Sequence, residues 1–406
     1  MAAKQKAESN TTNGTEVAAP QTNRTVEEIQ EMHLHQLAGL RVEEVPAHEL
    51  FGFTEEMKGV GNLPVFVDPH PLVPKINPDY VFNKSLVRRI LLSMKGGDSS
   101  ILLTGDKGTG KSSLAVQLHA HLRKPMIAIT GSNGVDDTHL LGCKTIKDGE
   151  VTEADGVLSY AYRTGLSCLI DEIFSLRPSV LVGVNDILQG DGVINLKHYG
   201  IDPTLDPRKL LNVDGGMTIV KHPTFRLFAT DNTGGKQQRD PRFAGVAAQN
   251  AAVRSRFTCF HVPFMAPEDE MAALQGAAAA YAAARELVNL ESMFIRQIVE
   301  YALRFRKAFA LGEACDTLSF REIQRWAYKW MMYAGSDENG MDPKILDESF
   351  VDSIYTNLEE TDRVLACSLF ESTFGRPLEL TEEHAFSVPE VADRFIAANM
   401  NLQKAA

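Results

Sequence analysis

The sequence predicts an α/β fold in which helices cover both faces of a five-stranded parallel sheet, giving three layers, followed by a helical domain. Five short apolar segments alternate with helical segments, as expected when helical crossovers join parallel strands. Two turn-rich insertions interrupt these crossovers, and the first has a β-hairpin pattern. From Pro267 onward the spacing of apolar residues is helical. The predicted fold is therefore an α/β core with β-hairpin insertions and a C-terminal helical lid.

The segment from Ile101 to Leu118 has the pattern of a buried strand, a glycine-rich loop and a helix. Residues 105–112 fit G-x-x-x-x-G-K-[ST], the phosphate-loop pattern, and this context disfavours a glycine turn that binds nothing. Glycines allow backbone N–H groups to face a phosphate chain, and the following helix N-terminus adds a favourable dipole. We expect Lys111 near the β- and γ-phosphates and Ser112 as a ligand of Mg²⁺. The predicted nucleotide-binding residues here are Gly105, Asp106, Lys107, Gly108, Thr109, Gly110, Lys111, Ser112 and Ser113.

Two carboxylates end the third predicted strand, residues 166–172, which is the second strand after the phosphate loop. The carboxyl ends of parallel strands share one sheet edge, so Asp171 and Glu172 should lie beside the phosphate loop. We expect Asp171 to hold Mg²⁺ through water, and Glu172 to orient and deprotonate the attacking water. The alternative is a solvated strand end, which the upstream phosphate loop disfavours.

The fourth predicted strand, residues 224–230, is followed by Asp231 and Asn232. A polar side chain at this strand end could contact both the γ-phosphate and the attacking water. We favour Asn232 for this role, with Asp231 as the second candidate.

Three arginines are further candidates for the site. Arg254 and Arg256 end a short predicted helix before the fifth strand, residues 257–262. They are either ordinary surface charges or, in a ring, an arginine finger that reaches the γ-phosphate of a neighbouring subunit. Arg321 lies in the first turn of a helix that Ser319 is expected to cap, and from there it could point back at the nucleotide.

An aromatic cluster precedes the phosphate loop. Tyr80, Val81 and Phe82 come just before a predicted helix over residues 84–94. They are placed either to hold an adenine base or to pack in the core, and the sequence leaves both possibilities open.

Composition restricts the class of protein. The chain has 406 residues, 44% hydrophobic and 23% charged, with a formal net charge of −12. The negative charge argues against binding nucleic acid over the whole surface, although a local basic pore remains compatible with it. Five dispersed cysteines indicate reduced thiols, and neither a membrane-spanning run nor a signal peptide is apparent, so we expect a cytoplasmic protein without a membrane partner.

The predicted domain organisation has five parts. The parts are a disordered tail (1–24), an N-terminal helix and irregular arm (25–83), an α/β nucleotide-binding domain (84–265), a helical lid (266–334) and a helical extension (335–406). Thr25 and Glu28 are expected to cap the helix that begins the second part. A two-residue turn at Asp148 and Gly149 predicts a hairpin over residues 145–151 in the nucleotide-binding domain.

Taken in order, these motifs resemble the AAA+ ATPases of the MoxR and chelatase branch, which includes the small subunits of aerobic cobaltochelatases. The resemblance covers roughly residues 51–330. It is carried by an early VPxIDPxYxF-like element at 73–82, TGxxGTGKS at 104–112, the hairpin region at 141–144 and 147–158, and FRLFATANT at 225–233.

The resemblance implies a role for each matching residue. Lys111 and Ser112 would be the Walker A pair, and Asp171 and Glu172 the Walker B pair. Asn232 would be sensor 1, Arg256 the arginine finger and Arg321 sensor 2. The chain departs from the family at Ser255, where the family has an aspartate beside the finger, and Arg254 is an additional candidate.

The resemblance also implies ATP and Mg²⁺ as cofactors, a homo-oligomeric ring, expected to be a hexamer, and a partner protein with a von Willebrand A domain. The ring would act as a chaperone-like ATPase that remodels or activates this partner, as in metal insertion by a cobaltochelatase. MoxR-like proteins unrelated to cobalamin, viral ones included, share the same core.

Two other functions remain open from the sequence. A nucleic-acid motor would need basic insertions, and the second insertion does contain basic residues between Lys197 and His222, which aspartates offset. A scaffold that binds ATP without turnover is disfavoured by Glu172 and the arginines. Because aspartates offset the basic residues of the second insertion, the sequence disfavours nucleic acid as a partner.

Overall fold

The computed structural model describes residues 41–147, 149–189, 192–196, 198–199, 218–232, 251–335 and 342–380. The predicted tail and the Thr25 helix lie outside the described residues, as do most of the second insertion and the end of the chain.

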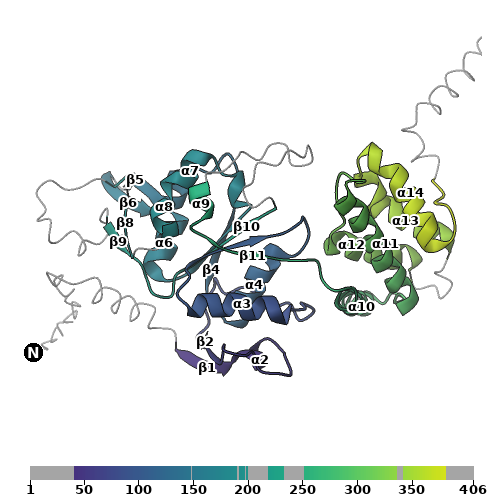
Figure 1. Ribbon diagram of the computed structural model, residues 1–406, viewed down its shortest axis with the longest axis horizontal. Helices are drawn as coiled ribbons and strands as arrows, with labels where there is room; N and C mark the ends of the chain where they lie inside the picture. Colours follow the sequence, from purple (N-terminus) through teal and green to yellow (C-terminus); the bar gives the residue numbers. More distant parts are fainter. Residues whose placement is uncertain are drawn as a thin grey trace, which may run out of the picture.

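The α/β part is built on a parallel sheet with strand order β11-β3-β10-β7-β4 (Figure 1). The strands form at the five predicted apolar segments, because runs of buried residues suit strands covered on both faces. Their bounds are Ser100–Thr104 (β3), Met126–Thr130 (β4), Ser167–Asp171 (β7), Arg226–Asp231 (β10) and Thr258–His261 (β11).

The sheet separates two hydrophobic clusters. Ile101 and Leu103 of β3 pack with α3 and α4, whereas Leu102 between them packs on the opposite face with the helices around α6. This alternation follows from the pleat of a strand, so the core has the predicted three layers. The helices are Lys84–Lys95 (α3), Lys111–His121 (α4), Asp137–Leu141 (α5), Val157–Thr164 (α6), Pro178–Gly183 (α7), Asn185–Gln189 (α8) and Ala251–Arg254 (α9).

Two details add to the sequence prediction. The segment after η1 forms two short helices, α7 and α8, which meet at Val184 after Gly183; glycine weakens a helix interior. The arm expected to be irregular contains β1 (Val42–Pro46), α2 (Ala47–Leu50) and β2 (Asn62–Phe66), and the two strands pair antiparallel.

Two insertions project from the α/β core as antiparallel pairs. The first is the predicted hairpin, longer than expected, with β5 (Gly142–Lys147) paired to β6 (Glu150–Asp155). The second pairs β8 (Val193–Asn195) with β9 (Thr218–Val220). A 3-10 turn, η1 (Ile173–Ser175), follows β7.

Among the described residues from 267 onward, five helices pack around one core (Figure 1). Trp326, Trp330, Tyr301 and Phe350 are fully buried at its centre. Helices α13 and α14 contribute to the same cluster as α10 to α12. The bounds are Pro267–Ala283 (α10), Ser292–Leu311 (α11), Phe320–Ala334 (α12), Pro343–Ser353 (α13), Tyr355–Asn357 (η4) and Glu360–Phe374 (α14).

Candidate nucleotide site

The phosphate loop and the predicted carboxylates meet at the carboxyl edge of the sheet. Strand β3 leads into the phosphate loop, β10 beside it ends at Asp231, and β7 on the far side of β10 ends at Asp171. In this register Asp231 lies opposite Thr104, the last residue before the loop. Open α/β sheets bind ligands at this edge, so the fold brings the loop and the carboxylates to a suitable place.

The phosphate loop has the backbone that its glycines permit. Gly108 and Gly110 have φ values of 80° and 84°, in the left-handed region that glycine adopts without strain. Gly110 immediately precedes α4, so the N–H groups of the first turn are directed at the loop. This arrangement fits a phosphate chain, because its donors converge where anionic oxygens would lie.

Lys111 is the buried cation of the loop. Its side chain is 7% exposed, and Nζ donates to the carbonyl oxygens of Gly105 (3.0 Å) and Asp106 (2.7 Å). Burial lowers the pKa of Lys111, and the nearby charges of Asp231, Asp106 and Asp171 oppose this shift. A desolvated ammonium group interacts strongly with an anion, which suits contact with phosphate oxygens.

We expect Lys111→Ala to weaken ATP binding roughly ten- to a hundredfold, because the phosphates lose charge-assisted hydrogen bonds worth about 1.5–3 kcal/mol. Isothermal calorimetry with ATP measures the loss. Lys58→Ala is the matched control, since Lys58 is an exposed lysine outside the predicted nucleotide site. Equal ATP affinity in Lys111→Ala and the unchanged protein would contradict the assignment.

The predicted metal ligands lie in contact. The hydroxyl of Ser112 donates to Oδ1 of Asp171 at 2.5 Å. A hydroxyl oxygen and a carboxylate beside a phosphate site form a donor set that suits Mg²⁺, which prefers oxygen ligands and retains several waters. Ser112 and Asp171 would therefore hold Mg²⁺, whose charge would offset that of the β- and γ-phosphates.

Thr230 belongs to this group and was missed in the sequence analysis. Its hydroxyl donates to Oδ1 of Asp171 and accepts a hydrogen bond from the backbone N–H of Glu172 at 3.0 Å. Thr230 thus fixes both carboxylate-bearing residues from the neighbouring strand. Its position as the polar residue that ends the apolar segment 224–230 could have identified it in the sequence.

Glu172 has a strained backbone. Its φ and ψ are 53° and 52°, in the left-handed region that non-glycine residues rarely adopt. The turn is held because the N–H of Gly131 donates to the Asp171 carbonyl at 2.7 Å, and a Cβ at Gly131 would lie 2.5 Å from the Glu172 carbonyl oxygen. Such strain is concentrated at functional sites, and the exposed carboxylate of Glu172 is accessible to water.

Both sensor candidates lie at this edge. Asp231 is 4% exposed and near enough to Lys111 for its charge to raise the pKa of that lysine. Asn232 follows directly after the strand and is half-buried. Asp231 therefore faces the buried cation, and the choice of Asn232 for the γ-phosphate stays a prediction.

The aromatic cluster is divided between two environments. Phe82 is buried and packs edge-on against Phe51 and His121, with ring centroids 5.1 Å apart in both pairs. Tyr80 is half-buried against Phe82, and burial raises the pKa of its phenol. Core packing therefore accounts for Phe82, and contact with adenine remains a prediction for Tyr80 and Val81.

The candidate finger arginines do not lie with this group. Arg254 ends α9 and Arg256 precedes β11, so both lie near the amino end of that strand, across the sheet from the phosphate loop. One contact of Arg256 is from Nη2 to Oε1 of Gln189, at 3.5 Å. The strand that follows them is parallel to β3, which ends at the loop.

The helical part reaches the loop near the start of α12. Ser319 caps this helix as predicted, in a reciprocal pair with Glu322. A Cβ on Gly108 would lie 2.2 Å from Cβ of Ser319, so the two backbones are in close contact. Arg321, in the first helical turn, is exposed.

A separate cavity of about 460 Å³ lies at the other end of the sheet. Its walls come from β1, β2, the end of α3 and the residues that precede β10, including Phe66, Met94, Lys124 and Thr224. It contains no residue of the phosphate loop and is therefore not the nucleotide site.

Comparisons with known proteins show what the chain is similar to. A family model described as AAA domain (dynein-related subfamily) matches residues 100–257. Aerobic cobaltochelatase subunit CobS of Sinorhizobium sp is 26% identical over 345 residues, covering 83% of this chain and 92% of that protein. An uncharacterised protein of Staphylococcus aureus (strain USA300) is 28% identical over 240 residues, covering 56% of this chain and 81% of its own.

Among solved structures, the RuvB Holliday junction branch migration motor of Thermotoga maritima matches with a TM-score of 0.41 and 14% identity, covering 78% of this chain and 85% of that chain. No helix in the described ranges has the length and apolar composition needed to span a membrane. Within the same ranges, no cluster of three or more His, Cys, Asp or Glu side chains is arranged to hold a metal ion.

Proposed function

Since residues 100–257 form an AAA domain and the chain is an AAA+ ATPase, we propose that it works as a homo-oligomeric ring that uses ATP to remodel or activate a partner protein. The ring is expected to be a hexamer, with Mg²⁺ held by Ser112 and Asp171 and with water activated by Glu172. The similarity to CobS supports a metal-insertion complex of the cobaltochelatase kind, whose partner would carry a von Willebrand A domain.

The observation that carries the partner proposal is the exposed tip of the β5–β6 hairpin. Ile146 and Val151 are cross-strand neighbours and are 74% and 68% exposed. Apolar side chains at the end of a projecting hairpin have little to stabilise them in water, and exposed apolar pairs of this kind suit a protein contact. The pair offers a small apolar surface next to charged residues Lys144 and Glu153 on the same face.

The base of the hairpin is firmly held. Oδ1 of Asp155, at the end of β6, accepts hydrogen bonds from Arg163 of α6 (3.0 Å) and from Tyr199 (2.9 Å). Ser159 of α6 also donates to the Leu141 carbonyl at 2.9 Å. A tip carried on such a base would follow movements of α6 and of the strand β7 after it, which ends in Asp171 and Glu172. This connection supports coupling between hydrolysis and a partner on the tip.

Replacing both tip residues by serine, Ile146→Ser with Val151→Ser, should leave the affinity for ATP within about twofold, because both residues belong to the hairpin insertion and neither belongs to the phosphate loop. Binding of a von Willebrand A partner, and any stimulation of ATPase rate by it, should fall at least about tenfold if both apolar side chains are buried in the contact, each contributing about 1.5–3 kcal/mol. A pull-down and steady-state phosphate release measure the two effects.

The matched control is Thr145→Ser with Thr152→Ser, a cross-strand pair on the opposite face of the same hairpin. This variant should bind the partner as the unchanged protein does. If the tip variant instead loses affinity for ATP, the hairpin is a structural part of the nucleotide-binding domain and the partner proposal fails. A wider replacement of residues 145–151 by a Gly-Ser link should behave as the tip variant does.

A further inference from the structure

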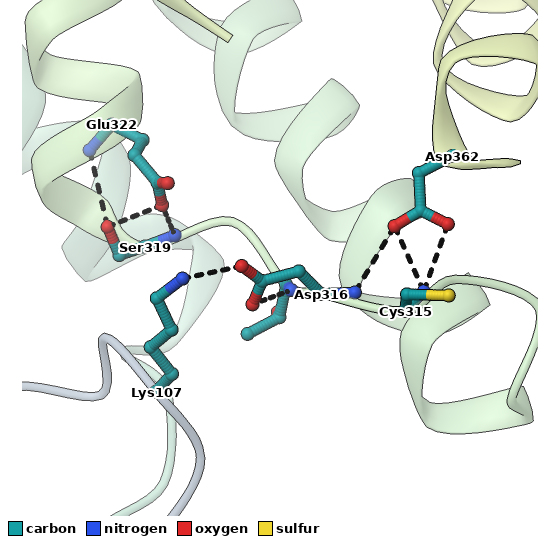
Figure 2. Close-up of polar contacts among 7 residues, drawn as sticks. Lys107, Cys315, Asp316, Ser319, Glu322 and Asp362 are labelled. Atoms are coloured by element: carbon teal, nitrogen blue, oxygen red, sulfur yellow. Dashed lines mark hydrogen bonds and ion pairs between the residues drawn. The ribbon is translucent and has the colours of Figure 1, made fainter. Parts of the chain in front are cut away.

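Two successive residues of the phosphate loop contact the helical part of the chain. Nζ of Lys107 lies 2.5 Å from Oδ2 of Asp316, in the segment between α11 and α12 (Figure 2). Gly108, the next residue of the loop, lies against Ser319, where a Cβ would come within 2.2 Å. The loop thus has two neighbours, the nucleotide site on one side and the segment 315–319 on the other.

Asp316 is itself held in a fixed orientation. Its Oδ1 accepts the backbone N–H of Thr317 at 2.8 Å, which leaves Oδ2 for Lys107. An aspartate that bonds the backbone of the next residue loses side-chain freedom before it meets its partner. The ion pair between exposed side chains therefore costs less conformational entropy than a pair of two free side chains would.

The backbone of this segment is held from a distant helix. Asp362 in the first turn of α14 is 1% exposed, and its carboxylate accepts the N–H of Cys315 (3.0 and 2.9 Å to the two oxygens) and of Asp316 (3.2 Å) (Figure 2). A buried carboxylate is costly unless hydrogen-bonded, and these backbone donors satisfy it. Asp362 thereby fixes the residue that contacts Lys107.

We propose that Asp316 and Asp362 are positioning residues that hold the start of α12 against the phosphate loop, so that helix α14 contributes to the affinity of the site for ATP. The inference rests on the nucleotide-binding role proposed for the loop. The physical reason is pre-organisation: with the segment 315–319 held against the loop, less conformational freedom of the loop remains to be lost when ATP binds. It gives the C-terminal helices a role that their sequence did not suggest.

The first test is a double-mutant cycle in the full chain on Lys107→Gln and Asp316→Asn, with kcat and KM for ATP measured. We expect Asp316→Asn to raise KM about two- to fivefold, the range for an ion pair with exposed partners, and to change kcat less than twofold. The double variant should have the KM of Lys107→Gln alone, because the second change removes a contact already lost. Effects that multiply in the double variant would overturn the proposal.

The second test concerns Asp362→Asn. We expect the same two- to fivefold rise in KM, with faster hydrogen exchange in peptides that cover residues 312–320 of the nucleotide-free protein. The matched control is Asp347→Asn, a second buried carboxylate of the helical part, which is 3% exposed and pairs with Arg376 at 2.8 Å. Thermal melting establishes that both variants are folded, and the control should leave the KM for ATP unchanged.

An equal rise in KM for Asp347→Asn would mean that general loosening of the helical part is the cause, and would overturn the proposal. So would unchanged exchange and KM in Asp362→Asn. Because the exchange measurement needs neither turnover nor partner, a failure of the partner proposal leaves this result interpretable.

Discussion

Glu172→Gln is expected to bind ATP with unchanged affinity and to hydrolyse it about 10²–10⁴-fold more slowly, the usual loss when a general base is removed. The substituted glutamine would keep the size of the side chain and its hydrogen-bonding oxygen, but an amide cannot accept the proton of the attacking water. The strained turn should be kept in Glu172→Gln, because backbone contacts of Gly131 and the hydroxyl of Thr230 hold it. These contacts do not use the carboxylate of Glu172.

Single-turnover hydrolysis and binding of a fluorescent ATP analogue separate the two effects. A matched control is Glu150→Gln, an exposed glutamate in the hairpin of the same domain, which should keep the full rate. If Glu172→Gln hydrolyses ATP at the unchanged rate, another group activates the water, and the buried carboxylate of Asp231 is then the next candidate.

The sequence predicted the strand-and-helix order of the core because local signals there agree with one another. Each sheet strand is a short apolar run, and the glycines of residues 105–110 mark the loop without reference to the rest of the chain. The pair Asp171 and Glu172 was recognisable because it follows an apolar strand downstream of a phosphate loop. Functional residues at the end of such a strand can therefore be predicted from the sequence.

Contacts between distant segments were not predictable in this way. Thr230 contacts Asp171 because β10 lies beside β7, and that neighbourhood is a property of the sheet order. The pairing of β1 with β2 was missed because Val42–Pro46 is largely exposed and carries two glutamates, so it lacks the alternation of a half-buried strand. Asp362 gave no signal, since a single aspartate in a helix is ordinarily a surface charge.

Arg256→Ala is expected to bind ATP normally and to lose about 10³–10⁵-fold in hydrolysis rate, the contribution of an arginine finger to phosphoryl transfer. The argument is geometric. Arg256 precedes β11 at its amino end, whereas the phosphate loop follows β3 at the carboxyl edge of the same parallel sheet. From that position the guanidinium is separated from its own phosphate loop by the length of the strand. In a head-to-tail ring it could instead contact the γ-phosphate bound to the phosphate loop of the neighbouring subunit.

Steady-state phosphate release as a function of protein concentration, with light scattering in parallel, tests the shared site. The rate per subunit should rise steeply where the ring assembles. Arg254→Ala is the matched control, because Arg254 is two residues away and lies in α9; we expect it to have the smaller effect. A monomeric preparation that hydrolyses ATP at the full rate would contradict a site shared between subunits.

Mixing two impaired variants, at an ATP concentration too low to saturate Lys111→Ala, makes the test decisive. In a ring that contains Arg256→Ala and Lys111→Ala subunits, some interfaces pair an intact phosphate loop from the first with an intact arginine from the second, so part of the activity should return. A chain that carries both substitutions supplies neither group, and mixing it with Arg256→Ala should restore nothing. If each arginine served its own subunit, no mixture of the two single variants could hydrolyse ATP, because every subunit would still lack one of the two groups.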